Sequence, residues 1–170
     1  EGVGLLVVVD EAVAIFDQTS FGKLLVQGRD AASLLDRVCA GRLDVPPGHV
    51  TYTPILNHRG GYESDVVAMR LREDAYLIVT GSGQQVRDID LLRRRIGPDE
   101  FVTLADMTSA YAVIGIMGPN ARDLLTRLSP NDLSNEAFPY MTHREVEIGD
   151  TVARAARISY IGELGWELYV

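Results

Sequence analysis

One carboxylate, Asp65, stands where the sequence pattern leads us to expect an apolar side chain. The stretch from Tyr52 to Arg70 predicts a β-hairpin, because Asn and Gly residues separate two strand-like runs and accept the backbone angles of tight turns. Side chains alternate between the faces of a strand, so Asp65 shares its face with Val67 and Met69. An ionised carboxylate there needs hydrogen bonds, a cationic neighbour or a raised pKa. Asp65 is therefore the first candidate for a catalytic residue.

A structural role for Asp65 is the alternative. An aspartate within a strand can face solvent at a sheet edge, or it can pair with a nearby arginine such as Arg70 or Arg72. Acids in such structural networks also have shifted pKa values. Periodicity alone leaves both interpretations open.

A second group of chemically active side chains lies in the last segment, SYIGELGWELYV. Residues 162–165 predict a four-residue turn between two strands. With that turn, Tyr160 faces Glu167 across the strand pair, and Tyr169 lies on the same face. An aromatic ring beside a carboxylate suits a flat heterocycle with adjacent N–H donors, because the ring stacks while the oxygens accept hydrogen bonds. A Tyr–Glu pair on a solvated sheet face is the alternative.

Other kinds of site find no support in the sequence. The three histidines are far apart and lack HxxxH or HExxH spacing, so we expect no metal site. The single cysteine, Cys39, excludes a disulfide framework and a multi-cysteine zinc site. Glycines at 81 and 83 resemble part of a dinucleotide loop, but Val86 stands where the third glycine belongs. No GxSxG motif of a hydrolase is present.

Composition limits the partners. The 170 residues, 46% hydrophobic and 24% charged, are those of one large globular domain or two small ones. The net charge of -8, with Lys23 as the only lysine, argues against nucleic acid. The longest apolar run, residues 4–9, is too short to cross a bilayer and lacks the flanks of a signal peptide. We therefore expect a soluble protein of the cytoplasm, or of the mitochondrial matrix in a eukaryote.

The periodicity of apolar residues predicts an α+β fold of antiparallel sheets with flanking helices. Expected helices span residues 10–17, 31–39, 83–96 and 119–128. Besides the Tyr52–Arg70 hairpin, expected strands span residues 21–27, 75–80, 101–105, 111–117, 145–148, 151–161 and 166–170. From residue 75 onward the order is strand, helix, strand, strand, helix, strand, which is the split βαβ order of ferredoxin-like modules.

Two motifs, LNHRGGYESDVV at 56–67 and SYIGELGWELYV at 159–170, resemble the folate-binding aminomethyltransferases. That family includes the T-protein of the glycine cleavage system and the C-terminal regions of sarcosine and dimethylglycine dehydrogenases. FDQTSFGK at 16–23, GPNARDLL at 118–125 and DLSNEAFP at 132–139 extend the resemblance over nearly the whole chain. The residues of these motifs are more similar to those of the dehydrogenases, since the T-protein tends to have paired acids where Ser64 and Asp65 stand.

The resemblance implies roles for four residues. Asp65 matches the catalytic aspartate of the family. Tyr160 and Glu167 match residues that hold the pterin of tetrahydrofolate, and Glu163 is a further candidate for this contact.

The resemblance also implies a domain division. Residues 1–74 would form the N-terminal part of the folate-binding aminomethyltransferase domain and residues 75–170 its ferredoxin-like part. The C-terminal remainder of the domain would lie beyond Val170, because the last expected strand stops there without a cap.

The implied activity is one-carbon transfer. An FAD-dependent domain elsewhere in the protein would oxidise an N-methyl group of sarcosine or dimethylglycine to an iminium. Nitrogen N5 of tetrahydrofolate would attack its carbon, the amine would depart, and N10 would close the ring to give 5,10-methylenetetrahydrofolate. Asp65 would stabilise positive charge and move a proton. A noncatalytic folate-binding or regulatory module, a T-protein-like aminomethyltransferase and an O- or S-demethylating transferase are the alternatives.

Overall fold

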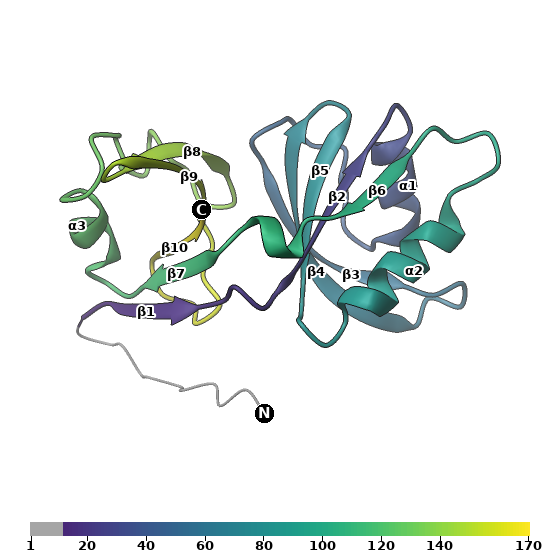
Figure 1. Ribbon diagram of the computed structural model, residues 1–170, viewed down its shortest axis with the longest axis horizontal. Helices are drawn as coiled ribbons and strands as arrows, with labels where there is room; N and C mark the ends of the chain where they lie inside the picture. The colour runs from purple at the N-terminus through teal and green to yellow at the C-terminus, as the bar shows by residue number, and fades with distance from the viewer. Residues whose placement is uncertain (1–11) are drawn as a thin grey trace.

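The computed structural model describes residues 12–170 and contains two five-stranded antiparallel sheets that lie side by side (Figure 1). The apolar run at residues 4–9 lies outside the described residues. The hairpin sheet consists of β2 (Gly22–Gln27), β3 (Val50–Leu56), β4 (Tyr62–Arg72), β5 (Ala75–Thr80) and β6 (Thr103–Asp106), in the order β3-β4-β5-β2-β6. The terminal sheet consists of β1 (Ala14–Asp17), β7 (Val113–Met117), β8 (His143–Ile148), β9 (Thr151–Ala156) and β10 (Gly165–Tyr169), in the order β1-β7-β10-β9-β8.

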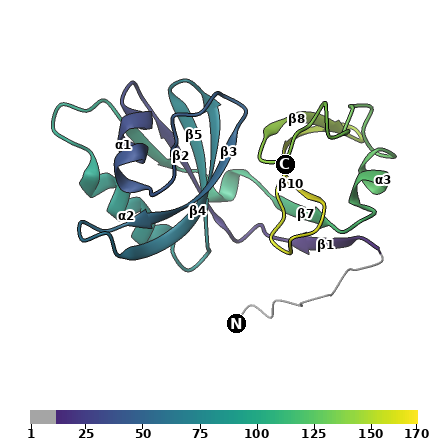
Figure 2. The same cartoon turned by 180° about the vertical axis from the view of Figure 1, so that it is seen from behind.

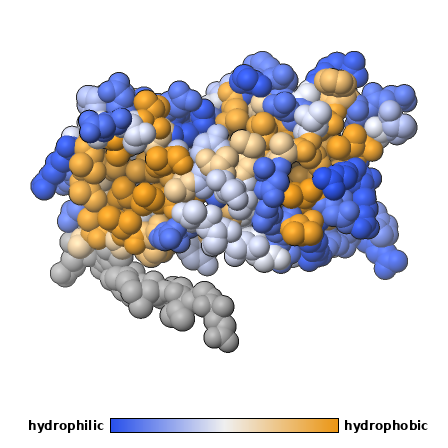
Figure 3. Space-filling view, viewed as in Figure 1, coloured by the Kyte–Doolittle hydropathy of each residue, from blue (hydrophilic) through white to orange (hydrophobic). Residues whose placement is uncertain are grey.

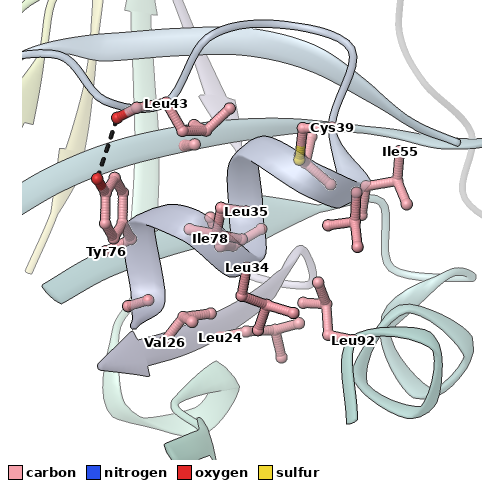
Figure 4. Packing of buried hydrophobic residues seen from close by; sticks show 14 residues of the cluster. Leu24, Val26, Leu34, Leu35, Cys39, Leu43, Ile55, Tyr76, Ile78 and Leu92 are labelled. Atoms are coloured by element: carbon pink, nitrogen blue, oxygen red, sulfur yellow. Dashed lines mark hydrogen bonds between the residues drawn. The ribbon is translucent and has the colours of Figure 1, made fainter. Parts of the chain in front are cut away.

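Two helices, α1 (Ala31–Val38) and α2 (Gln85–Arg95), cover one face of the hairpin sheet (Figures 1 and 2). The apolar residues of α1 recur every three or four positions, so Leu34 and Leu35 point into the core shared with β2 and β5 (Figure 4). The Tyr76 hydroxyl crosses this core and donates to the Leu43 carbonyl at 3.0 Å. Cys39 is buried in the same cluster, and burial raises the pKa of its thiol to about 12.

The opposite face of the hairpin sheet packs against the terminal sheet. Met69, Leu77 and Val79 from the hairpin sheet form one buried cluster with residues such as Val113 and Tyr169 of the terminal sheet. The predicted alternation along β4 is confirmed, because its other face contributes to the helix-side core instead. Asp65 therefore lies on the strand face that is turned toward the terminal sheet.

Lys23 of β2 is fully buried. Its ammonium group donates to the Thr19 carbonyl at 2.8 Å and to the Tyr111 carbonyl at 2.9 Å. Burial lowers the pKa of Lys23, because the charged form loses its hydration. These contacts tie the start of β2 to the segment that enters β7.

A split βαβ unit is present, but not where the sequence places it. The strands β5 and β6 both pair antiparallel with β2, so they run parallel to each other with β2 between them, and α2 connects them. The chain then leaves this sheet after β6, passes through the short 3-10 helix η1 (Thr108–Ala110), and builds the terminal sheet. The ferredoxin-like unit is thus not made of residues 75–170, because its central strand comes from residues 22–27.

The helix expected at residues 10–17 is wrong within the described part. Residues 14–17 form the edge strand β1, which pairs with β7. A segment this short gains little from helical hydrogen bonds, whereas a neighbouring strand satisfies its backbone directly. The helix expected at 119–128 is shorter than predicted, since α3 spans only Ala121–Leu125.

The surface of the terminal sheet carries exposed apolar side chains. Ile15 of β1 and Ile114 of β7 are exposed, and Figure 3 shows apolar residues gathered over this half of the visible face. Among residues 12–170, no helix is long and apolar enough to cross a membrane.

Candidate functional site

A cavity of about 730 Å³ lies between the two sheets. Strands β3, β4 and β5 form one side of the cavity. The other side is formed by β10, the loop before β8 and the loop after β9. Three of the residues singled out from the sequence, Asp65, Tyr160 and Glu167, line this one cavity. The space is of the size that holds a small-molecule ligand.

Asp65 is exposed at the mouth of the cavity and is held by two phenols. The Tyr52 hydroxyl donates to its Oδ2 at 2.6 Å, and the Tyr62 hydroxyl donates to its Oδ1 at 2.5 Å. The hydrogen bonds from Tyr52 and then Tyr62 outweigh partial desolvation and hold the pKa of Asp65 below its ordinary value. Hydrogen bonds therefore stabilise the ionised form of Asp65, rather than a cationic neighbour or a raised pKa. The pairing with Arg70 or Arg72 does not occur, since those side chains bind other carboxylates.

The turn of the hairpin that carries Asp65 is ordered by Asn57. Its side-chain oxygen accepts the backbone N–H groups of Arg59 and Gly61, both at 2.9 Å. Gly60 adopts a positive φ of 76°, which glycine tolerates without strain. The sequence signal of Asn and Gly residues therefore predicts this hairpin correctly.

Glu167 lies at the buried end of the cavity, with only 5% of its surface exposed. The Tyr169 hydroxyl donates to its Oε2 at 2.7 Å, while the Gln18 amide reaches its Oε1 over a longer 3.4 Å. Burial raises the pKa of Glu167 above its ordinary value, although both hydrogen bonds act to lower it. Its Oε1 keeps capacity to accept a further donor.

Small neighbours make room for this arrangement. Glu167 is paired with Gly115 of β7 on one side and Ala156 of β9 on the other. A Cβ at position 115 would lie 2.6 Å from Oε1 of Gln18, so glycine at this position leaves room for the Gln18 side chain where it lies beside Glu167.

The predicted pairing of Tyr160 with Glu167 is wrong. The strand expected to run to residue 161 ends at Ala156, where the N–H of Ile158 turns back to the Ala156 carbonyl at 3.0 Å. Tyr160 consequently lies in the loop between β9 and β10, with 83% of its surface exposed, and reaches the cavity from that loop. The expected common face of Glu167 and Tyr169 is confirmed by their hydrogen bond.

Glu163 is exposed on the same loop and is not among the described residues that line the cavity. Sequence reasoning missed three residues that surround Asp65 and Glu167: Gln18, Tyr52 and Tyr62. The position of Tyr52 could have been inferred, because it shares a strand face with Pro54, the partner of Asp65.

The site combines two carboxylates with different protonation preferences. The phenols favour the ionised form of Asp65, whereas burial favours the neutral form of Glu167. Among the described residues that line the cavity, none is Lys, Arg or His. Two buried oxygens at its wall, Oε1 of Gln18 and Oγ of Ser159, have no hydrogen-bond partner within residues 12–170. Such a cavity suits an uncharged or cationic ligand that carries N–H donors.

The fold and the cavity together define a domain of two antiparallel sheets with a small-molecule-sized cavity between them. The solved structure of the glycine cleavage system aminomethyltransferase T from Bartonella henselae has a TM-score of 0.80, with 22% sequence identity, over 95% of this chain and 43% of that one. The described sheets are therefore those of the aminomethyltransferase fold. The family described as the GCVT N-terminal domain matches residues 6–170, so the chain belongs to that family.

Two curated relatives lie closer in sequence. A 4-methylaminobutanoate oxidase (formaldehyde-forming) from Paenarthrobacter nicotinovorans is 42% identical, and the mitochondrial sarcosine dehydrogenase of Mus musculus is 35% identical. Each comparison covers 94% of this chain but only 19% of the relative. The kinship inferred from the sequence motifs is thus confirmed, and the chain corresponds to about a fifth of each relative.

Proposed function

We propose that this chain is the tetrahydrofolate-binding one-carbon transfer domain of a protein resembling sarcosine or dimethylglycine dehydrogenase, and that it captures an iminium carbon as 5,10-methylenetetrahydrofolate. The observation that carries the proposal is the meeting of Asp65 and Glu167 in one cavity between the sheets. The names of both curated relatives supply support, since they refer to oxidation of N-methylated amino acids.

The donor and acceptor groups of the cavity fit a reduced pterin. A pterin ring presents adjacent N–H donors, and the buried end of the cavity offers acceptors: Oε1 of Glu167 and the unpartnered oxygens of Gln18 and Ser159. The exposed ring of Tyr160 is free to stack on a flat heterocycle at the cavity wall. The lack of Lys, Arg or His in the described lining means that the glutamate tail of a folate would extend toward the mouth.

Bound tetrahydrofolate supplies two nucleophilic nitrogens that together accept a one-carbon unit. Glu167 would orient the ring by accepting its N–H groups, and burial would strengthen these hydrogen bonds. Asp65 would remain ionised near neutral pH, because two phenols donate to it. Its negative charge would stabilise the positive charge of an iminium at the mouth and accept the proton released by a nucleophilic nitrogen.

The iminium must come from another part of the protein. We propose an FAD-dependent oxidoreductase domain as its source, because this chain corresponds to 19% of relatives named oxidase and dehydrogenase. The N-methyl amino acid would be oxidised there, and the carbon would be passed to this cavity.

The decisive experiment measures formation of 5,10-methylenetetrahydrofolate by the full-length protein supplied with tetrahydrofolate and formaldehyde or an iminium donor. We expect Asp65→Asn to keep the folate dissociation constant within about tenfold of the wild-type value while most transfer is lost. Asp150→Asn makes the same chemical change on an exposed residue of the turn between β8 and β9, and serves as the matched control.

Two results would reject this assignment. Full transfer by Asp65→Asn would remove the aspartate from the reaction. Tight folate binding by a wild-type protein that never accelerates transfer would favour a noncatalytic folate-binding or regulatory module instead.

A further inference from the structure

Tyr62 holds a place at the site that the proposed function does not use. Its hydroxyl donates to Oδ1 of Asp65 at 2.5 Å, while Tyr52 occupies Oδ2. Unlike Tyr52, it is not among the described residues that line the cavity. We infer that Tyr62 is a positioning residue, which fixes the orientation and the charge of the Asp65 carboxylate without touching the ligand. The inference rests on the proposed role of Asp65 in transfer.

A β-bulge places Tyr62 beside Asp65. The two residues are three positions apart, so in a regular strand their side chains would point to opposite faces. Strand β4 carries one extra residue, Glu63, opposite the step from Ile55 to Leu56 of β3. The extra residue reverses the alternation and turns the Tyr62 hydroxyl toward Asp65.

The bulge is held from two sides. The Asn57 side chain, which already orders the hairpin turn, donates to Oε1 of Glu63 at 2.9 Å. Arg87 of α2 forms an ion pair with the other oxygen of Glu63. Because a helix and a turn both bind the extra residue, the position of Tyr62 is built into the hairpin rather than left to a mobile side chain.

The consequence for Asp65 is that both of its oxygens are engaged by O–H donors. Rotation of the carboxylate would disturb both of these bonds, and its protonation would weaken them, because hydrogen bonds to a charged acceptor are the stronger ones. The lowered pKa of Asp65 agrees with this geometry, and hydrogen bonding to Asp65 raises the pKa of Tyr62 in turn. The other titratable or charged groups around this position are Tyr52 on β3, Glu63 with Arg87, Asp88 on α2, and Tyr160 and Glu167 across the cavity.

The test is Tyr62→Phe in the full-length protein, because it deletes the hydroxyl and keeps the ring. Tyr62 is 64% exposed, so folding should be unaffected. At pH 5 we expect a water-soluble carbodiimide and an amine to label Asp65 several-fold faster than in the wild type, as followed by peptide mass spectrometry. Loss of the Tyr62 hydrogen bond to the charged form raises the pKa of Asp65 and so increases its protonated fraction. The acid limb of the pH profile of transfer should shift to higher pH, with the folate dissociation constant within about twofold of wild type.

Tyr76→Phe is the matched control, since it removes a buried phenol hydroxyl that donates to Leu43 on the far side of the sheet. It should lower the melting temperature but leave Asp65 labelling unchanged. Equal labelling of Asp65 in Tyr62→Phe and wild type would overturn the inference. Because labelling requires no turnover, a wild-type protein without transfer activity would reject the proposed function while this measurement still decides the role of Tyr62.

Discussion

Replacing Glu167 by glutamine should weaken folate binding and stabilise the fold at the same time. In the proposed complex, the ligand donates to Oε1, whose protein donor, the Gln18 amide, is 3.4 Å away. Losing one hydrogen bond to a charged acceptor costs about 1.5–3 kcal/mol, or roughly 10- to 150-fold in the dissociation constant. Calorimetric titration with tetrahydrofolate measures this change directly.

The stability effect follows from the sign of the pKa shift. The pKa of Glu167 is raised above its ordinary value of 4.5, so the folded protein holds this proton more tightly than the unfolded chain. Its contribution to stability is greatest at low pH and falls as the pH rises from about 4.5 through the raised pKa. Glutamine carries no charge at this buried position, so it removes this loss. We therefore expect a melting temperature at pH 7 that equals or exceeds that of the wild type.

Thermal melts between pH 4 and pH 8 and the titration together provide the check. Glu147→Gln, on the exposed surface of β8, makes the same chemical change outside the cavity and should leave both measurements unaltered. Unchanged folate affinity in Glu167→Gln would exclude this residue from the binding site. A lower melting temperature at pH 7 would contradict the argument from burial.

Three further substitutions test other parts of the structure. Tyr160→Ala should weaken folate binding about twofold to tenfold in calorimetry, through the lost stacking contact, without changing the melting temperature; equal affinity would exclude the contact. Gly165→Ala should cost about 1–3 kcal/mol in urea denaturation, because its Cβ would lie 2.8 Å from Cγ of Met117, whereas the open position of Gly83→Ala should tolerate the change. Asp88→Ala should also cost about 1–3 kcal/mol, since two buried hydroxyls lose their acceptor; unchanged stability would show that water replaces it.

The hairpin that carries Asp65 could be predicted because its signals are local. Turn residues fixed its reversal, and the alternation along β4 identified the face of the aspartate. The strand face of Tyr62 could not be predicted in this way, because a bulge reverses the alternation and sequence periodicity does not reveal a single extra residue.

The terminal segment was harder to predict because its register depends on distant partners. The sequence pattern predicts that Tyr160 and Glu167 face each other across a hairpin, but Glu167 pairs with Gly115 and Ala156 instead. Gln18 lies 149 residues before Glu167, so no local pattern could link them. The family resemblance nevertheless selected Asp65 and Glu167, which line the same cavity. A family resemblance carries information on long-range contacts that periodicity lacks.

The burial of Lys23 has a consequence for the chemistry of aldehydes. Lysine amines condense with aldehydes to form Schiff bases, and the only lysine of this chain is fully buried with its ammonium group bound to two carbonyls. The accessible surface of residues 12–170 therefore presents no lysine amine to a stray aldehyde. A domain of this composition can work beside a source of one-carbon electrophiles without being cross-linked through its own lysine side chain.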